Sequence, residues 1–407
     1  MGTKLYILVE NFSNSERESF FEQELPYLVT AFDEVVVIPL YPDETKLSFY
    51  APNLRVEDFD FFKSSNRINT LLNNLFTIIR IFWFEIIHTH NRVFYLKNFV
   101  SNLNQLLFKL AAATNLEKLI RKDIHSKTVF YSYWFMQWFM ALSIIKLKHP
   151  KMIIVSRVHG ADYDENQIKS TLPFRYFQLA QINRIFPVSV FAKTYLQSKF
   201  KVESKKIDVS RLGIQSLKYL SPINESELHI VSCSSIISLK RVDLIVEILK
   251  HISIYVKWTH FGDGQLAEDV KRKALQLGNH VSVNFMGYVS NDIFLNYLKN
   301  HSVSFFINVS ESEGLPVSMM EAISHGIPLI GTDICGVPEI VVKETGFLFP
   351  VNFDPKKIAE KIMFEHEKGS IYAESFRNNI YEFYLKNFKA DTNHEKFSIK
   401  ILSLCAE

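Results

Sequence analysis

Two carboxylates lie eight positions apart in the stretch Ser310–Ala322, which follows an apolar run and leads into a helical pattern. Ionised carboxylates only accept hydrogen bonds, so Glu313 and Glu321 suit a ligand rich in hydroxyl groups, such as ribose or a hexose. Pro316 suits the first helical turn and Gly326 the C-terminal end of the same helix. The helix N-terminus offers free N–H groups and partial positive charge, which favour a diphosphate. On spacing alone, two solvated acids near a helix start explain the pattern equally well.

A histidine in the first half of the chain also stands where a binding site would form. His159 and Asp162 follow the apolar run Met152–Val158, which is typical of a buried strand. A lone histidine is more often structural, but ligands of open α/β sheets bind outside the carboxyl ends of the strands. His159 and Asp162 are therefore candidates for a site. Arg211, close to the expected domain boundary, is a candidate to contact phosphate.

Short apolar runs alternate with longer helical patterns and must position these residues. Buried, non-alternating strands between helices indicate a parallel sheet with helices on both faces. The pattern occurs twice, so the sequence predicts two doubly wound domains with the site in a cleft between them. We expect domains over residues 1–215 and 216–385, and a C-terminal helix over 386–407 that packs back on the first domain. The expected strands are Lys4–Val9, Glu34–Leu40, Thr128–Tyr131, Met152–Val158, Arg184–Val188, His229–Cys233, Tyr255–Phe261, Val281–Phe285, Val303–Val309 and Ile327–Gly331.

Composition limits the class of protein. The 407 residues are 47% hydrophobic and 22% charged, which describes a globular chain of two or three domains. A net charge of +3 is too small to make nucleic acid the main partner. The cysteines Cys233, Cys335 and Cys405 have no metal-ligand or redox spacing and favour reduced thiols in the cytoplasm. We expect neither a transmembrane helix nor a signal peptide.

Residues 66–123 form a basic segment with interleaved aromatic residues. An ordinary helix packed on the sheet explains the segment. A surface that docks on an anionic membrane is the second interpretation, and the two are compatible. The basic residues are Arg67, Arg80, Arg92, Lys97, Lys109, Lys118, Arg121 and Lys122, against the acids Glu85, Glu117 and Asp123.

The stretch around Glu313 and Glu321 resembles the glutamate-x7-glutamate signature of retaining glycosyltransferases of family 4. Downstream, Gly326–Asp333 and Gly336-Val337-Pro338-Glu339 are similar to a strand and a turn of that family. The resemblance covers nearly the whole chain and is specific in the second domain. It implies the GT-B fold, with two Rossmann-like doubly wound parallel-sheet domains facing across a cleft.

The resemblance also implies roles for residues of the second domain. Glu321 would hold the ribose of the nucleotide, and Glu313 would hold hydroxyl groups of the donor sugar. N–H groups around Gly314 and Leu315 would meet the sugar or the diphosphate. Lys240 takes the position of a lysine that neutralises the diphosphate.

The chain departs from the family pattern in two loops. Ser235 replaces the usual arginine five positions before Lys240, and Arg241 is the candidate to compensate for it. Asn11-Phe12-Ser13 stand where many members have paired glycines. Glu18–Leu25 instead resembles members that build bacterial capsules or exopolysaccharides, which favours an acceptor role for this loop.

These features predict a retaining hexosyltransferase, independent of metal and cofactor, that acts in the synthesis of cell-surface polysaccharide or lipopolysaccharide. It would move a hexose from a nucleoside-diphosphate sugar to a hydroxyl group of a glycan or lipid-linked acceptor, with His159 beside the sugar. We expect it in the cytoplasm, peripheral to the inner face of the membrane. Two alternatives stay open: a sugar-nucleotide epimerase of the same fold, and a non-catalytic protein that binds nucleotide or membrane, which the loss of arginine at Ser235 would suit.

Overall fold

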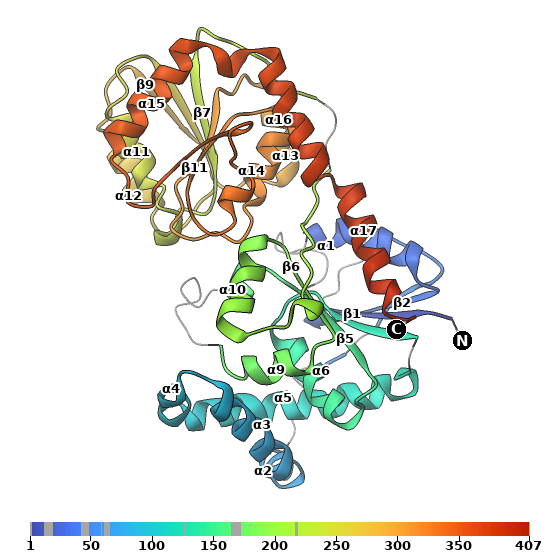
Figure 1. Cartoon of the computed structure of the whole chain (residues 1–407). Helices are drawn as coiled ribbons and strands as arrows, with labels where there is room; N and C mark the ends of the chain where they lie inside the picture. The colour runs from blue at the N-terminus through green and yellow to red at the C-terminus, as the bar shows by residue number, and fades with distance from the viewer. Residues whose placement is uncertain are drawn as a thin grey trace. The chain divides into compact units, whose positions relative to one another are not determined.

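The chain folds into two compact units, each built on a six-stranded parallel sheet (Figure 1). The computed structural model describes residues 2–11, 19–41, 49–57, 59–60, 66–125, 127–163, 172–215 and 219–406. The first unit comprises Met1–Gly213 with Ala390–Glu407, and the second comprises Ile214–Lys389. The predicted pair of doubly wound α/β sheets is confirmed.

The sheet of the first unit has the strand order β3-β2-β1-β4-β5-β6. Its order reverses between β1 and β4, which both pair in parallel. The strands are β1 (Lys4–Asn11), β2 (Glu34–Tyr41), β3 (Leu54–Val56), β4 (Thr128–Ser132), β5 (Ile153–Val158) and β6 (Arg184–Pro187). The helices are α1 (Ser19–Ala31), α2 (Arg67–Asn73), α3 (Leu75–His88), α4 (Arg92–Lys97), α5 (Phe99–Ile120), α6 (Gln137–Lys148), α7 (Gly160–Tyr163), α9 (Arg175–Gln181), α10 (Val190–Phe200) and α17 (Ala390–Ser403), with short 3-10 helices η2 (Arg121–Asp123) and η3 (Ser204–Lys206).

The sheet of the second unit has the order β12-β11-β10-β7-β8-β9 and reverses between β7 and β10. Its strands are β7 (Leu228–Cys233), β8 (Val256–Phe261), β9 (Val281–Phe285), β10 (Phe305–Asn308), β11 (Leu329–Thr332) and β12 (Gly346–Phe349). Its helices are α11 (Asp243–Leu249), α12 (Ala267–Ala274), α13 (Asn291–Asn300), α14 (Val317–Ser324), α15 (Pro355–Lys368) and α16 (Glu374–Asn387), with 3-10 helices η4 (Ser238–Lys240), η5 (Val337–Glu339) and η6 (Ser370–Tyr372).

Alternation along β1 shows how one sheet serves two hydrophobic layers. Successive strand side chains point to opposite faces. Leu5 and Ile7 join a buried cluster with residues of α1 and α17, whereas Tyr6 and Leu8 join a second cluster with residues of α5 and α6. The central strands are therefore apolar at nearly every position, and this is the pattern that made them recognisable in the sequence.

The helix α17 completes the first unit. It lies beside α1 and places Phe397 in the buried cluster on that face of the sheet (Figure 1). Beneath it, Glu24 of α1 and Arg157 of β5 form a fully buried ion pair with an Nε–Oε2 distance of 2.9 Å. The Arg157 guanidinium also lies 3.7 Å from the centre of the Phe397 ring. Burial opposes ionisation of Glu24, but the charge of Arg157 outweighs it and lowers the pKa of the carboxyl.

Two strands were not expected from the sequence. β3 has three residues and β12 has four, and each pairs on one side only at an edge of its sheet. Such short edge strands lack the long apolar run of a central strand. Helix α6 begins at Gln137, because β4 is followed by a bend over residues 133–136.

Candidate functional site

The candidate site of the second unit lies where the strand order of its sheet reverses. β7 and β10 are neighbours there, and the loops that follow them begin after Cys233 and after Asn308. The chain leaves these strands in opposite lateral directions, which opens a crevice at their carboxyl ends. Lys240 comes from the first loop and Glu313 from the second.

Glu313 is held by three donors that meet at one of its oxygens. Oε1 accepts hydrogen bonds from Lys240 Nζ at 2.6 Å, Ser310 Oγ at 2.6 Å and Asn308 Nδ2 at 3.1 Å. Only 8% of the residue is exposed, and burial alone would raise the pKa of the carboxyl. The charge of Lys240 and these hydrogen bonds outweigh burial and lower the pKa. Glu313 is therefore an ionised carboxylate in a mostly buried setting.

Backbone bonds between the two loops bring Lys240 to Glu313. Lys240 ends η4, and the backbone N–H of Glu311 donates to the carbonyl of Leu239 at 2.9 Å. The side chain of Glu311 itself is exposed to solvent. Of these two acids, Glu313 is therefore the one that pairs with Lys240.

Arg241 ties three loops together. Its backbone is left-handed, with φ of 48°, and ends η4. Its guanidinium donates to the carbonyls of Val309 at 2.8 Å, Val351 at 2.9 Å and Ser310 at 3.4 Å. These contacts hold the loops after β10 and β12 against the loop after β7. Arg241 therefore has a structural role that these bonds explain. They give no support to the prediction that Arg241 compensates for the arginine missing at position 235, where the side chain of Ser235 is exposed.

Glu321 lies in α14 and has a different electrostatic setting. Only 5% of the residue is exposed, and burial raises the pKa of its carboxyl to about 8, against a smaller opposite effect of a hydrogen bond with Asn291 of α13. Unlike Glu313, Glu321 has no basic side chain in the described part of the chain that lowers the pKa of its carboxyl. Two carboxyls of one site thus differ in protonation at neutral pH: Glu313 is ionised, and Glu321 is largely protonated.

The start and end of α14 follow from its sequence. Pro316 occupies the N-cap, one position before the first helical residue, and Gly326 ends the helix with a φ of 68°. No side chain caps the N-terminus, although Ser318 Oγ donates to the carbonyl of Cys233 at 3.2 Å and so fixes the helix start against β7. The predicted strand, loop and helix over residues 305–324 are confirmed.

Glycines let the surrounding turns approach closely. A Cβ atom on Gly336 would lie 2.0 Å from the carbonyl oxygen of Gly314, and one on Gly262 would lie 2.0 Å from that of Ser234. Real Cβ atoms do not come this near, so both positions exclude a side chain. Gly336 therefore presses its turn onto the loop that carries Glu313 and the buried Leu315. Gly262 does the same for the loop that carries Ser235.

His159 of the first unit directly follows β5 and is held from two sides. Its backbone N–H donates to Asp162 Oδ2 at 2.7 Å, and its Nδ1 lies 3.3 Å from the same oxygen. The centre of the imidazole ring lies 4.2 Å from the ring centre of Trp134 and 5.1 Å from the ring centre of Tyr133. The buried Nε2 atom has no hydrogen-bond partner among the described residues. The Asp162 contact favours a proton on Nδ1, which would leave Nε2 to accept a hydrogen bond.

The other candidates of the first unit are less defined. Arg211 is half-buried in the segment that leads out of the first unit. Of the stretch predicted to meet the acceptor, Asn11 ends β1 and Ser19–Leu25 lie in helix α1, whereas Phe12–Glu18 lie outside the described residues.

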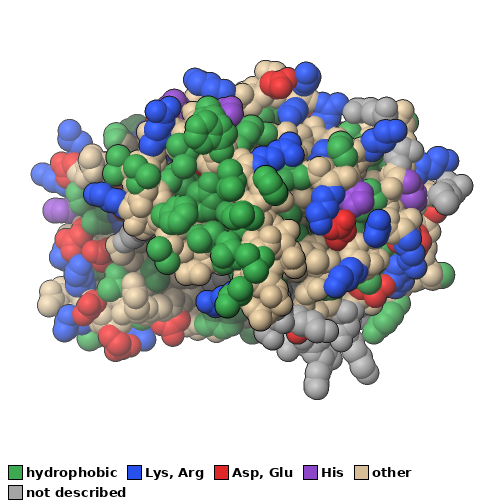
Figure 2. All heavy atoms as spheres, turned by 90° about the horizontal axis from the view of Figure 1, so that it is seen from below, with side chains coloured by type: hydrophobic (Ala, Val, Ile, Leu, Met, Phe, Trp, Pro, Cys, Tyr) green, Lys and Arg blue, Asp and Glu red, His purple; other side chains and the backbone are tan. Residues whose placement is uncertain are grey.

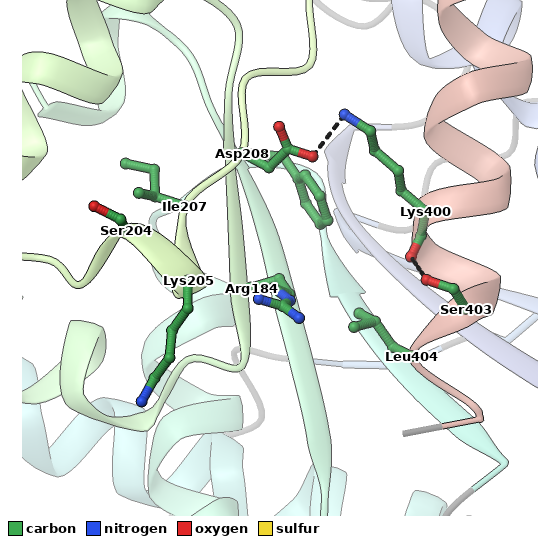
Figure 3. A pocket seen from close by; sticks show the side chains of 9 residues that line it. Arg184, Ser204, Lys205, Ile207, Asp208, Lys400, Ser403 and Leu404 are labelled. Atoms are coloured by element: carbon green, nitrogen blue, oxygen red, sulfur yellow. Dashed lines mark hydrogen bonds and ion pairs between the residues drawn. The ribbon is translucent and has the colours of Figure 1, made fainter.

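The first unit also has a hollow of about 390 Å³ at the opposite edge of its sheet (Figure 3). Arg184, the first residue of β6, lines it together with Lys205 of η3 and Lys400 of α17. Lys400 is already paired with Asp208 at 2.6 Å, as the dashed line in Figure 3 marks. Because Arg184 begins a strand whereas His159 follows one, this hollow lies at the amino edge and away from His159.

Three residues of the second-unit site were not predicted from the sequence. Asn308 and Ser310 hold Glu313, and Asn291 contacts Glu321. Asn308 and Ser310 could have been noticed, because they are polar residues at the end of a buried strand. Asn291 carries no local signal, since it reaches Glu321 from another helix.

Over the described ranges, no group of three or more His, Cys, Asp and Glu side chains is placed to hold a metal ion.

The chain is similar to several known proteins. Over 220 residues the chain is 25% identical to the amylovoran biosynthesis glycosyltransferase AmsK of Erwinia amylovora, covering 50% of this chain and 54% of that protein. It is likewise 25% identical over 221 residues to a putative colanic acid biosynthesis glycosyltransferase, WcaL of Escherichia coli, covering 51% and 54%. The chain therefore spans about half the length of these curated relatives.

Solved structures match over a greater length. HepE of Anabaena in complex with UDP superposes with a TM-score of 0.69 at 12% identity, covering 98% of this chain and 100% of that one. The lipopolysaccharide outer core galactosyltransferase WaaB gives a TM-score of 0.72 at 13% identity, covering 99% and 100%. At these identities the superpositions show the fold alone, and they confirm two Rossmann-like domains of the GT-B type. Residues 217–383, which include Lys240, Glu313 and Glu321, match the family described as "Glycosyl transferases group 1".

Proposed function

We propose that this protein is a retaining glycosyltransferase that moves a hexose from a nucleoside-diphosphate sugar to a hydroxyl group of a glycan acceptor. The second unit would bind the donor, and the first unit would bind the acceptor. The curated relatives that act in amylovoran and colanic acid biosynthesis support a role in the synthesis of cell-surface polysaccharide. The odd, scattered cysteines support a cytoplasmic location for the reaction.

The observation that carries the proposal is the arrangement at the reversal point of the second sheet. Lys240, the start of α14 and two chemically different carboxyls gather at the carboxyl ends of β7 and β10. A diphosphate suits the cation and the helix N-terminus, because both carry positive charge. Glu321, one turn into α14, suits the hydroxyl groups of a ribose, because its carboxyl donates and accepts a hydrogen bond when protonated and accepts two when ionised.

The leaving group explains why Lys240 matters for the reaction. As the sugar–phosphate bond breaks, negative charge develops on the diphosphate, and a preorganised cation stabilises it. The ion pair with Glu313 holds Lys240 in place before the donor arrives, so less side-chain entropy is lost on binding. Because three donors already meet at Glu313 Oε1, a sugar hydroxyl would engage Oε2.

His159 is the residue of the first unit that we assign to the sugar. Its Nε2 atom is held at a fixed place by Asp162 and the Trp134 ring, and it would accept a hydrogen bond from a hydroxyl of the sugar. Transfer with retention requires no protein nucleophile if the leaving phosphate takes the proton of the acceptor hydroxyl.

We expect the nucleotide of the donor to be UDP, because the structure of HepE, a structural neighbour, was solved with UDP and with UDP-glucose. The test is thermal unfolding with UDP, GDP and ADP, on the wild-type protein and on Glu321→Ala. We expect one nucleotide to raise the unfolding temperature and the substitution to weaken that response. A response to none of the three, or an equal response in the variant, would remove the basis of the donor site.

A second measurement separates transfer from the alternatives. With donor and acceptor present, glycosyl transfer releases nucleoside diphosphate and leaves the anomeric configuration of the sugar unchanged, which NMR of the product shows. We expect activity to persist with EDTA. Formation of a sugar-nucleotide isomer without acceptor would instead identify an epimerase.

A further inference from the structure

The first unit exposes an unusually apolar surface on four successive helices, α2 to α5. Eleven of the twenty-four large hydrophobic side chains that the described residues expose lie within residues 68–100. Phe76 is 89% exposed and Trp83 is 66% exposed. Seen from below, these helices present a broad hydrophobic area with Lys and Arg side chains along its edge (Figure 2). We refer to the exposed apolar side chains of residues 68–100 as the 68–100 patch.

Helix α3 is apolar on both of its faces. Ile78, Ile81 and Phe82 point into the core of the first unit, whereas Phe76, Ile79 and Trp83 point outward. A surface helix in water normally has one polar face, and a helix that is apolar all round is buried on all sides or lies against lipid. The inner face accounts for only half of the apolar residues of α3, so the outer face requires a partner.

The charges around the patch have one sign. Arg67, Arg80, Arg92 and Lys97 are exposed on these helices. Glu85 is the only acid between residues 66 and 116, and it faces inward. Its carboxylate oxygens accept bonds from Tyr95 Oη and from the backbone N–H of Phe177, each at 2.8 Å. The exposed charged side chains between residues 66 and 116 are therefore all positive.

These inward contacts also fix how α3 meets its partner. Within the described ranges, no single helix has the length and apolar composition to cross a bilayer. Helices α2 and α3 have that length and composition only when they are taken together, and a bend of 75° separates them. A spanning α3 would take Glu85 out of its hydrogen bonds and Phe82 away from the Phe174 ring. The helix is thus anchored lengthwise on its unit, with its outer face parallel to the surface, as in helices that lie at a membrane interface.

We propose that the 68–100 patch docks this protein on an anionic lipid bilayer. Phe76, Ile79 and Trp83 enter the boundary between headgroups and acyl chains, and Arg80, Arg92 and Lys97 contact lipid phosphates. This proposal rests on the first unit alone and does not depend on the donor site of the second.

A second copy of the chain is the other partner that could cover such a patch. A twofold dimer would place the same surface of both copies face to face. The exposed bases of one copy would then meet those of the other, with no exposed carboxylate on these helices to offset them. The charge pattern therefore favours a negatively charged lipid surface over self-association.

The test is sedimentation of the full chain with vesicles of phosphatidylcholine alone and of phosphatidylcholine with phosphatidylglycerol. We expect binding to the anionic vesicles only. The triple variant Arg80→Gln, Arg92→Gln and Lys97→Gln should bind on the order of a hundredfold more weakly, since each base near the surface contributes about fivefold. The matched control is Lys356→Gln, Lys357→Gln and Lys368→Gln, three exposed lysines of α15 in the second unit with the same loss of charge. Equal binding of both triple variants would overturn the proposal.

Trp83 gives a local readout of insertion. Its fluorescence should shift to the blue on vesicle binding and be quenched by brominated lipid, and Trp83→Phe should remove this change. Trp138 and Trp258 are buried and should not respond. Vesicle binding without a Trp83 change would show that another surface binds the membrane. Loss of a dimer in Phe76→Ser, with no vesicle binding by the wild-type protein, would assign the patch to self-association.

Discussion

Lys240 and Glu313 lie 73 positions apart and form an ion pair of 2.6 Å where the strand order of the second sheet reverses. The pair joins the two loops on which a donor would rest. It also gives a partly buried lysine and a buried carboxylate their neutralising partners. The same contact thus supports both the stability of the unit and the site, and the two roles can be separated experimentally.

Lys240→Met should destabilise the second unit by about 2–4 kcal/mol, because it leaves Glu313 buried without its counter-charge. The double variant Lys240→Met with Glu313→Gln should recover part of this loss, since no unpaired charge is left. Neither variant should transfer sugar. Urea unfolding of the four proteins of this cycle measures the coupling, and additive losses would show that the two side chains do not interact.

The stability that ionised Glu313 contributes should depend on pH. The pKa of its carboxyl is lower in the folded protein than the usual 4.5. The contribution is therefore complete above pH 4.5 and lost as the pH falls through the folded-state pKa. The stability difference between wild type and Glu313→Gln should shrink on acidification below pH 4.5.

Glu321 should have the opposite effect. Its pKa of about 8 in the folded protein exceeds the 4.5 of an unfolded chain, so the folded state holds a proton that the unfolded state has released. Stability therefore falls as the pH rises from 4.5 to about 8. Glu321→Gln should match wild type near pH 4.5 and unfold on the order of several degrees higher at pH 8. A difference independent of pH would contradict burial as the cause of the shift.

His159→Ala should lower the rate of sugar transfer by about a hundredfold or more, and it should leave the thermal response to nucleotide unchanged. The reason is that His159 belongs to the first unit, whereas the candidate nucleotide contacts belong to the second. Calorimetric titration with UDP beside a transfer assay distinguishes the two effects. A weaker affinity for UDP in this variant would place His159 in nucleotide binding.

Gly336→Ala should abolish nucleotide binding, because its Cβ would clash with the Gly314 carbonyl and push the Glu313 loop away. Gly287→Ala is the control: φ there is positive, at 66°, whereas φ of Gly336 is −87°, and no atom lies within 4 Å of an added Cβ at Gly287. It should cost only about 1–2 kcal/mol of stability. Equal nucleotide responses of the two variants would show that the close approach at Gly336 does not shape the site.

The sequence predicted the central strands and the helix α14 because each carries its own local signal. Apolar runs mark the strands, and Pro316 and Gly326 bound the helix. Short edge strands such as β3 carry no such run. Their formation depends on an open neighbouring edge, which only the assembled sheet provides.

The candidate acids Glu313 and Glu321 could likewise be chosen from their spacing. Their difference in protonation could not be predicted from it. Glu313 is ionised because Lys240 reaches it from another loop, and Glu321 is largely protonated because the packed unit removes it from water. Arg241, the candidate to compensate for the arginine missing at Ser235, donates to three backbone carbonyls. Each of these outcomes depends on contacts between segments that are distant in sequence, so a local pattern does not contain them.

The position of α17 in the sequence has a consequence for biosynthesis. A ribosome makes the whole second unit before it makes the helix that covers Glu24, Arg157 and the apolar face around Phe397. The nascent first unit must therefore wait with that face uncovered while some 176 residues, Ile214–Lys389, are translated. At about 5–20 residues per second this interval lasts on the order of ten seconds or more, during which the uncovered face is a natural substrate for chaperones.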